Sequence, residues 1–505
     1  MTQQVIIVGG GVAGLTAALH LAQRGLAPLV LEKDALFAGG RLAGGEQIAI
    51  TQGDSTYTFR LEHGVHGIWL PYVNLKAVLA RYQIDAGLTP SADETWVYRD
   101  KGRVRRANVG RAIRRSWFPA PIHYFGLFLR PRFLQILGLR GWLSLPFVWY
   151  GLALALGMDP LREQQPLTGM SLADYMRRWS PAVRAFCIGL ARNSLSAQPD
   201  EIPLSGFLAF LRYYTLLRRD AWEFDFLPAD GGTAVIEPMV AKLQELGGEV
   251  RLGTAVTHLT PLADGWHVHM NDGQTLTAKH VILAADVTGT AQILANSPDL
   301  AAQTHDLHWP QGRETAVIRL WFTRAPHPRA SAAAGLFTGD FMIDNFFWLH
   351  RLQTTYQQWH EQTGGSAIEV HIYGPGNLLQ QPDAALLAQA INDVQAVFPE
   401  LRGHLLHQHL QRNSVPHTLF SIGAAGQHLT VQTAWPGLYC SGDWVYHPAP
   451  AFFLERAALT GLEAANAILE TENLSPFPAV NYPPPEPFAG FVEKLMLRGR
   501  KKLRD

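Results

Sequence analysis

Cysteine is nearly absent from this chain of 505 residues, which contains only Cys187 and Cys440. Two cysteines cannot build the disulfide framework of a small secreted protein, and they fit a reducing cytosol. We also expect no secretory signal, because the first apolar run leads directly into a glycine turn. The sequence therefore predicts a cytoplasmic protein.

Neither sign of charge is in excess, since 42 basic and 42 acidic residues cancel. A chain without a basic surplus has no general attraction to nucleic acid, so we expect no nucleic-acid partner. With 47% hydrophobic and 17% charged residues, the composition is that of a globular protein rather than a disordered one. The length predicts two domains.

Clusters of metal-ligating side chains are also lacking. The 20 histidines are scattered along the chain. His404, His407 and His409 lie close together, but no set of cysteines or carboxylates accompanies them. These histidines indicate a solvated face rather than a metal site, and we expect no metal ion.

A glycine-rich turn directly follows the first apolar run. Residues 5–8 (VIIV) suit a buried strand, residues 9–14 (GGGVAG) fit the pattern GxGxxG, and residues 15–24 predict a helix. This order of strand, turn and helix is typical of a dinucleotide site. The free N–H groups and positive dipole end of the helix would face the phosphates.

Each glycine of the pattern has a physical task. Gly9 would allow the tight turn, Gly11 the close approach of a pyrophosphate, and Gly14 the close packing of helix against strand. Glu32 stands at the tip of the next apolar strand, where its carboxylate could accept hydrogen bonds from an adenosine ribose. These residues predict a dinucleotide ligand.

Two further stretches narrow the choice of dinucleotide. Gly39-Gly40-Arg41 adds a second glycine turn and a cation close to Glu32, and residues 437–443 (GLYCSGD) predict a late strand that ends in Gly442 and Asp443. The whole pattern resembles the FAD-dependent amine oxidase and phytoene desaturase superfamily. That resemblance implies FAD as the cofactor, with the late Gly-Asp against its ribityl–phosphate part and the helix that follows directed at the flavin ring.

The glycine pattern and the resemblance together predict the cofactor contacts. They are Gly9, Gly11, Val12, Ala13, Gly14, Glu32, Lys33, Gly39, Gly40, Arg41, Leu42, Gly64, Val65, His66, Val256, Ala285, Gly442, Asp443 and Phe452.

The predicted fold class is α/β, with a Rossmann-type (glutathione-reductase-like) FAD domain that is discontinuous in sequence. We expect residues 1–75, 226–289 and 431–475 to build it. Residues 76–225 and 290–430 should build an α+β substrate-binding domain. We expect residues 476–505 to be a basic amphipathic tail, which the Pro483-Pro484-Pro485 break sets apart from the body of the protein.

Residues 101–158 contain no aspartate or glutamate, although they contain one lysine and nine arginines interleaved with aromatic residues. Arginine, tryptophan and tyrosine beside apolar side chains are typical of a membrane interface. Residues 142–158 carry no charge, but they include Pro146 and are at the lower length limit for crossing a bilayer. A monotopic membrane-contacting segment is the favoured interpretation. The alternatives are a substrate-domain core and a true span.

The tail indicates a second surface contact. Phe488, Phe491, Val492 and Leu495 recur at helical spacing, and basic residues crowd the last positions from Lys494 to Arg504. A basic amphipathic helix would lie on an anionic surface. A frayed, solvated terminus is the alternative. Both segments together predict a peripheral protein on the inner face of a membrane.

One stretch gives a narrower resemblance. Residues 61–69 (LEHGVHGIW), followed by 72–75 (YVNL), resemble the EHGxHG…YxNL stretch of carotenoid desaturases and aromatic-ring-forming carotene synthases. This resemblance implies a lipophilic polyisoprenoid substrate and, most simply, carotenoid desaturation by hydride transfer to flavin N5. The accompanying proton would go to a protein base, for which His66 and Glu455 are the candidates. Either residue could instead be purely structural.

The alternatives are a flavin-dependent amine oxidase, and a carotenoid isomerase or squalene-type dehydroxylase that uses the same fold. An amine substrate is less favoured, because residues 451–457 (AFFLERA) form an apolar rather than a polar approach to the ring. The oligomeric state leaves no signal in the sequence.

Overall fold

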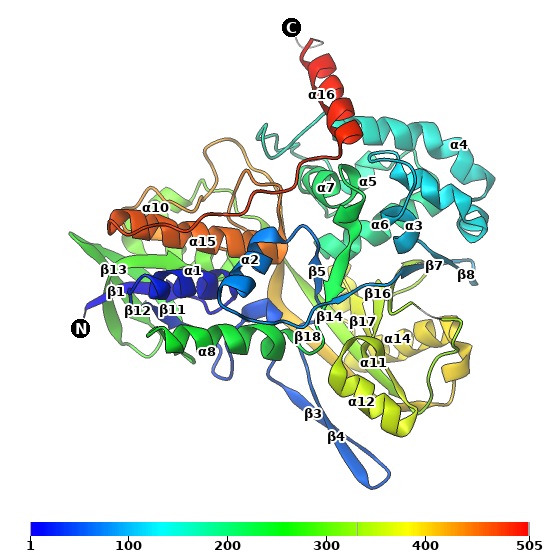
Figure 1. Cartoon of the computed structure of the whole chain (residues 1–505), viewed down its shortest axis with the longest axis horizontal. Coiled ribbons are helices and arrows are strands. Elements are labelled where there is room, and N and C mark those ends of the chain that lie inside the picture. Colours follow the sequence, from blue (N-terminus) through cyan, green and yellow to red (C-terminus); the bar gives the residue numbers. More distant parts are fainter. Residues whose placement is uncertain (1, 331, 503–505) are drawn as a thin grey trace.

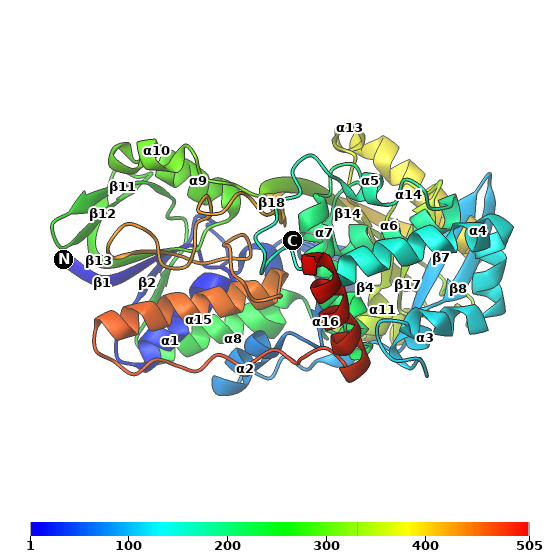
Figure 2. The ribbon, with the colours of Figure 1, turned by 90° about the horizontal axis from the view of Figure 1, so that it is seen from above.

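The computed structural model describes residues 2–330 and 332–502, which fold around two large sheets (Figure 1). One sheet lies on the side of the N-terminus and the other lies beneath the long helices of the inserted segments (Figure 2). The α/β class and the discontinuous Rossmann-like domain are confirmed.

The first sheet draws its strands from three distant parts of the chain. Its parallel strands, in spatial order, are β10 (Glu249–Arg251), β2 (Leu29–Leu31), β1 (Thr2–Val8), β13 (Thr275–Leu283) and, beside the end of β13, β19 (Leu438–Cys440). The antiparallel strands β12 (Gly265–Met270) and β11 (Val256–Leu262) extend the sheet past the start of β13.

Three helices cover one face of this sheet: α1 (Val12–Gln23), α15 (Phe453–Thr471) and α8 (Glu237–Glu245) (Figures 1 and 2). Residues 12–22 of α1 are all buried, because this helix lies between the sheet and α15. The contact with α15 requires Gly461, where a Cβ atom would lie 2.3 Å from the carbonyl oxygen of Ala13. Sequence-distant helices therefore pack at backbone contact directly behind the glycine turn.

The second sheet is mixed and belongs to the inserted segments. Its spatial order is β18 (Leu405–Leu419), β14 (Gln311–Phe322), β17 (Ser366–Ile372), β16 (Asn345–Trp348), β15 (Ala334–Gly339), β7 (Glu94–Asp100) and β8 (Arg103–Asn108).

Side chains alternate across this sheet. Ile318 and Leu320 of β14 pack with α14 (Asp383–Val397) in one apolar core, whereas Trp321 packs on the other face with α12 (Thr354–Thr363). Arg319 shares the face of Trp321, and so do Glu369 and His371 of β17. This second face carries the polar residues described below.

The smaller elements complete the described chain. They are β3 (Gln47–Gln52), β4 (Ser55–Arg60), β5 (Gly67–Trp69), α2 (Val73–Arg81), β6 (Thr89–Pro90), α3 (Gly110–Arg114), α4 (Pro131–Leu156), α5 (Leu172–Tyr175), α6 (Pro181–Leu195), α7 (Leu204–Leu211), β9 (Phe224–Phe226), α9 (Val287–Ala295), α10 (Pro298–Thr304), α11 (Leu349–Leu352), α13 (Gly376–Leu379) and α16 (Pro487–Lys502).

The acid-free stretch, residues 101–158, comprises several structural elements. Its first part, β8, is the edge strand of the second sheet and pairs with β7. Helix α4 is long and apolar enough to cross a membrane by length and composition, and only 28% of its most apolar window is buried. Gly138 interrupts it with φ near 60°, so α4 is kinked.

The tail forms α16, which packs against α4 (Figure 2). Glu493 of α16 pairs with the buried Arg212, and Arg500 pairs with Glu163. The predicted charge of Arg504 lies outside the described residues.

Candidate cofactor and active site

A cavity of about 750 Å³ opens where the first sheet meets the second, within the size range of cofactor sites. Its walls come from the glycine turn, the end of β2, one side of α9, the middle of β18 and the Gly442-Asp443 turn. The predicted residues that line it are Gly9, Gly11, Val12, Ala13, Glu32, Lys33, Gly39, Gly40, Arg41, Leu42, Val256, Ala285, Gly442 and Asp443. The other predicted contacts, Gly14, Gly64, Val65, His66 and Phe452, do not line it.

The glycine turn has the geometry of a phosphate cradle. Gly9 has φ near 110°, and a Cβ there would lie 2.7 Å from the carbonyl oxygen of Ala284. At Gly11 a Cβ would meet no atom within 4 Å, so this residue faces open space. Helix α1 has no side-chain cap, which leaves the N–H groups of Val12 and Ala13 available at the cavity wall.

Glu32 lies at the far end of the same wall. Its carboxylate accepts hydrogen bonds from the backbone N–H of Gly10 at 2.7 Å and of Asp34 at 2.9 Å. The carboxylate is thus held in place beside the turn, and its remaining lone pairs are available to a ribose.

The two predicted FAD stretches meet across the cavity. Arg41 donates to the carboxylate of Asp443 at 2.6 Å, and Thr418 donates to the other oxygen of that carboxylate at 3.0 Å. Burial disfavours a charged Asp443, but the Arg41 guanidinium outweighs this effect and lowers the pKa of Asp443. A residue near the start of the chain and one near its end therefore form one charged pair in the cavity wall.

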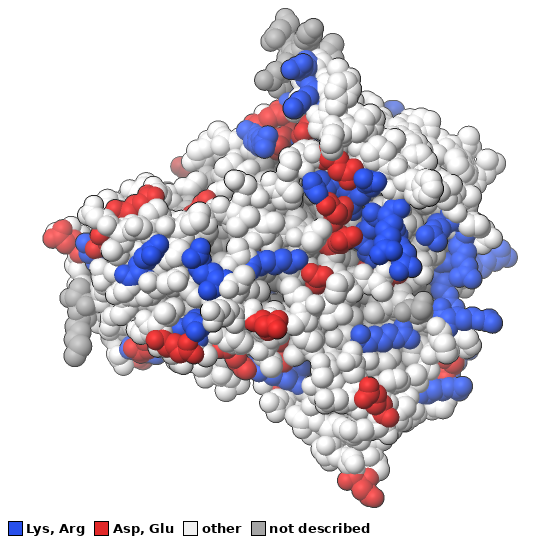
Figure 3. All heavy atoms as spheres, viewed as in Figure 1, with Lys and Arg blue, Asp and Glu red and all other residues white. Residues whose placement is uncertain are grey.

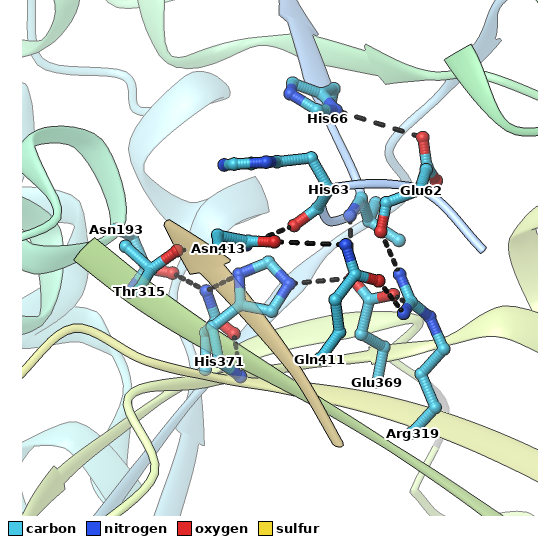
Figure 4. A network of polar contacts seen from close by, with 12 residues as sticks. Glu62, His63, His66, Asn193, Thr315, Arg319, Glu369, His371, Gln411 and Asn413 are labelled. Atoms are coloured by element: carbon cyan, nitrogen blue, oxygen red, sulfur yellow. Dashed lines mark hydrogen bonds and ion pairs between the residues drawn. The ribbon is translucent and has the colours of Figure 1, made fainter. Parts of the chain in front are cut away.

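The EHGVHG loop, residues 62–67, lies over the second sheet (Figure 4). Glu62 is buried and accepts from the N–H of Gly231 at 3.0 Å and from the Gln353 side chain at 2.9 Å. Asn413 of β18 donates to the carbonyl of His63 at 2.8 Å. The loop is therefore bound to three separate parts of the chain.

An ion pair beneath this loop is wholly enclosed. Arg319 and Glu369 lie on neighbouring strands, with 2.7 Å between Nε and the carboxylate (Figure 4). Arg319 also donates to the carbonyl of Glu62 at 2.6 Å and to Gln411 at 3.0 Å. The N–H of Val65 donates to Glu369 at 2.6 Å. Both charges of the pair thus hold the loop through its backbone.

His371 continues the network from Glu369. Its Nε2 lies 2.7 Å from Glu369, and its Nδ1 lies 2.7 Å from the hydroxyl of Tyr373. Burial alone would raise the pKa of Glu369, but Arg319 and His371 lower it to about 2, so the carboxylate is ionised. Because an ionised carboxylate only accepts, Nε2 of His371 carries a hydrogen, and in the neutral ring Nδ1 accepts from Tyr373.

His371 also limits the conformation of the loop. Gly64 has φ near 152°, and a Cβ at this position would lie 3.0 Å from the ring of His371. The loop therefore approaches the sheet more closely than any residue with a side chain could without moving that ring.

Two half-buried histidines, His63 and His417, lie near the Arg41–Asp443 pair. Burial, together with neighbouring positive charge such as that of Arg41, lowers the pKa of His63 well below its usual value and that of His417 to about 3. Both rings are therefore neutral at physiological pH. They bring hydrogen-bonding nitrogens, but no charge, to this end of the cavity.

Glu455, one of the two predicted proton acceptors, has another position. Its carboxylate accepts from the N–H groups of Asn74 and Leu75 and from the Asn74 side chain, each at 2.9 Å. Glu455 lies in the first turn of α15, where it is fully buried against the start of α2. Its neighbours Leu454 and Ala457 line the cavity. Through these hydrogen bonds Glu455 holds the YVNL stretch.

His66, the other candidate, is half-buried and less constrained. Its Nδ1 lies 3.9 Å from Glu62 and has no hydrogen-bond partner among the described residues. Nδ1 of His66 is therefore a ring nitrogen of the loop that makes no hydrogen bond with the described residues.

Arg319, Glu369 and His371 are not among the site residues predicted from the sequence. A signal was present, because each is a polar residue within an otherwise apolar strand: AVIRLWF in β14, and AIEVHI in β17. A buried charge in such a run requires a partner. The sequence does not identify which strand supplies that partner.

The comparisons with known proteins agree with this geometry. A family model described as flavin containing amine oxidoreductase matches residues 162–469, and one described as NAD(P)-binding Rossmann-like domain matches residues 7–82. The chain belongs to the flavin containing amine oxidoreductase family. It is a FAD-dependent oxidoreductase.

Curated relatives match along most of the chain. A carotenoid phi-ring synthase of Streptomyces griseus is 28% identical, covering 92% of this chain and 87% of that protein. A carotenoid phi-ring synthase of Chlorobaculum tepidum is 23% identical, covering 95% and 90%. A 15-cis-phytoene desaturase of Capsicum annuum is 22% identical, covering 93% and 78%.

Solved structures share the fold. Cyclohexylamine oxidase from Brevibacterium oxydans IH-35A has a TM-score of 0.67 at 17% identity, covering 94% of this chain and all of that chain. An oxidoreductase from Methanosarcina mazei has a TM-score of 0.63 at 16% identity, covering 91% and 99%. Identity this low supports the shared fold but no shared substrate.

The ionised Glu369 predicts a specific pH dependence of stability. Its pKa is lowered from the ordinary value near 4.5 to about 2, so its contribution is complete above pH 5 and is lost as the pH falls toward 2. Glu369→Gln should lower the free energy of unfolding by about 3 kcal/mol at pH 7, because Arg319 stays buried without a counter-charge. The difference from the wild type should shrink by about 2 kcal/mol between pH 6 and pH 3.

Urea denaturation at several pH values measures both effects. Glu361→Gln on the exposed side of α12 is the matched control and should stay within about 0.5 kcal/mol of the wild type. If the free energy of unfolding changed with pH in the same way for Glu369→Gln and the wild type, the pKa of Glu369 would not be lowered by its neighbours.

Proposed function

We propose that this protein is a FAD-dependent desaturase that acts on a carotenoid. The observation that carries the proposal is the extent of the similarity to carotenoid enzymes, which covers 92% and 95% of the chain for the two phi-ring synthases. Such coverage includes the inserted segments that form the second sheet as well as the dinucleotide-binding half. A likeness in the nucleotide-binding half alone would carry no information about the substrate.

The cavity residues fit FAD. The glycine turn and the start of α1 would hold the pyrophosphate, and Glu32 would hold the adenosine ribose. Arg41 and Asp443 would take the phosphate and ribityl part, since they present a cation and an acceptor at one point of the wall. When bound, FAD would supply the hydride acceptor, N5, for oxidation of a C–H bond.

The protein residues have to position the substrate and accept a proton. The Arg319–Glu369 pair fixes the EHGVHG loop, so that Gly64 to His66 keep one conformation. The Nδ1 atom of His66, which lacks a partner among the described residues, is the group we propose as proton acceptor. We do not propose Glu455 for that role, because its carboxylate already accepts three hydrogen bonds from α2.

A lipophilic substrate reaches a water-soluble enzyme only through a membrane or a carrier. We propose that the apolar face formed by residues 117–129, α4 and α16 contacts the inner face of a membrane as a peripheral attachment. The exposed large side chains of this apolar face are Trp117, Phe118, Leu129, Leu139, Trp142, Leu143, Phe147, Tyr150, Phe488, Phe491 and Leu495. In Figure 3 the surface over α4 is largely free of charge, and lysine and arginine gather beside it over β7 and β8.

Asp443→Ala should purify with little or no bound flavin. The substitution removes the acceptor and leaves Arg41 unpaired in the cavity, so we expect FAD affinity to fall at least tenfold, which is about 1.4 kcal/mol. Flavin absorbance per protein after gel filtration measures this occupancy. Asp264→Ala, in an exposed turn of the first sheet, should keep full occupancy. Normal flavin content in Asp443→Ala would remove this residue from the cofactor site.

Carotenoid conversion is tested by co-expression in a bacterial host that makes phytoene or ring-ended carotenoids. We expect a new product that has lost pairs of hydrogen atoms, detected by mass spectrometry. Asp443→Ala serves as the flavin-deficient control and should leave the carotenoid pool unchanged. His66→Gln should retain flavin but slow flavin reduction by the substrate. Conversion of cyclohexylamine together with an unchanged carotenoid pool would reject the proposal.

Vesicle flotation tests the apolar face. Leu139 and Leu143 are 75% and 69% exposed, and each buried leucine contributes about 1.5–3 kcal/mol. Leu139→Ser/Leu143→Ser should therefore reduce membrane partitioning at least tenfold. Leu262→Ser, at an exposed position of β11, is the matched control and should bind vesicles as the wild type does. Equal flotation of both variants would show that α4 does not contact lipid.

A further inference from the structure

A second, smaller cavity lies at the edge of the second sheet, away from the cofactor site. Its volume is about 70 Å³, which is room for a few water molecules or one small ion. Its apolar floor includes Phe346, Trp348 and Phe398. Three arginines line it: Arg106 from β8, Arg132 from the first turn of α4, and Arg329 from the loop before β15.

The positive charge of this cavity has no counter-charge. None of the residues that line it is acidic. Within the described ranges, Arg106, Arg132 and Arg329 form no ion pair and donate no side-chain hydrogen bond. Nearby acids are engaged elsewhere: Glu94 pairs with Arg114, and Glu400 accepts from the N–H of His327. All three arginines are exposed, so water screens part of their mutual repulsion, and an anion that joins them would remove more of it.

Polar groups in the cavity wall also offer donors. Asn108 uses its side-chain oxygen to accept from Thr95 at 2.9 Å, which leaves its NH₂ group free to donate. Trp348 is fully buried, and its indole N–H has no partner among the residues that the structure describes. A buried N–H without an acceptor costs free energy, so this side chain still has an unused donor.

We propose that this cavity binds a phosphate group. Guanidinium groups match the geometry of phosphate oxygens and bind them in pairs, and a wall of donors without an acid favours an anion of more than one charge. The phosphate would belong either to a free ion or to the headgroup of an anionic lipid, since Arg132 lies at the start of the membrane-facing helix α4. The site stands whether or not the proposed carotenoid reaction is correct.

Two assays with the FAD-loaded protein test the site and separate the two sources. Titration calorimetry with inorganic phosphate measures binding of the free ion. Flotation with phosphatidylcholine vesicles, with and without phosphatidic acid, measures binding of the headgroup. The triple variant Arg106→Gln/Arg132→Gln/Arg329→Gln should lose at least tenfold in affinity in the assay that detects binding.

The matched control is Arg105→Gln, which removes the same charge from the same strand at an exposed position that does not line the cavity. It should change affinity less than twofold. If the triple variant lost affinity only because the protein had lost positive charge in general, the control would lose affinity as well. Binding of inorganic phosphate assigns the site to the free ion, and binding of phosphatidic acid vesicles alone assigns it to a lipid. No binding in either assay, or an equal loss in the control and the triple variant, would overturn the proposal.

Discussion

The ion pair between Arg319 and Glu369 is the contact on which the arrangement of the active region depends. It lies inside the second sheet, yet both of its members bind the backbone of the EHGVHG loop, which belongs to the first part of the chain. Removing one partner from a buried pair costs about 3–5 kcal/mol, because the other charge is left without compensation. The ion pair thus joins the second sheet to the EHGVHG loop through charge-assisted hydrogen bonds.

The features of the site that arise from local sequence could be predicted. The glycine turn, Glu32 and Arg41 are recognisable because their function depends on spacing along a single strand–turn–helix unit. The network of Glu369 and His371 could not be assigned, since it depends on which strands become neighbours. Glu455 shows the same limit. Its position after Gly442-Asp443 predicted a place beside the flavin ring, whereas in the structure its carboxylate accepts hydrogen bonds from the start of α2.

The acid-free stretch is uniform in composition but is divided between different parts of the fold. Its arginine and aromatic content predicted a single membrane-contacting segment, but pairing with β7 makes its first part an edge strand. The remaining part, α4, packs against α16 from the other end of the chain. The buried Arg212 bridges the two helices, because it donates to the carbonyls of Ala155 and Leu156 at the end of α4 and pairs with Glu493 of α16. The apolar face is therefore built from both segments, whereas the sequence presents them as unrelated.

The order of strands in the first sheet has a consequence for synthesis of the protein. Strand β1 pairs with β13, and β13 pairs in turn with β19 at residues 438–440, so the sheet is incomplete until these residues have left the ribosome. Asp443 and α15, which complete the cavity wall and cover α1, come later still. The cavity wall therefore cannot be complete in a growing chain before the segment from β19 to α15 has been made.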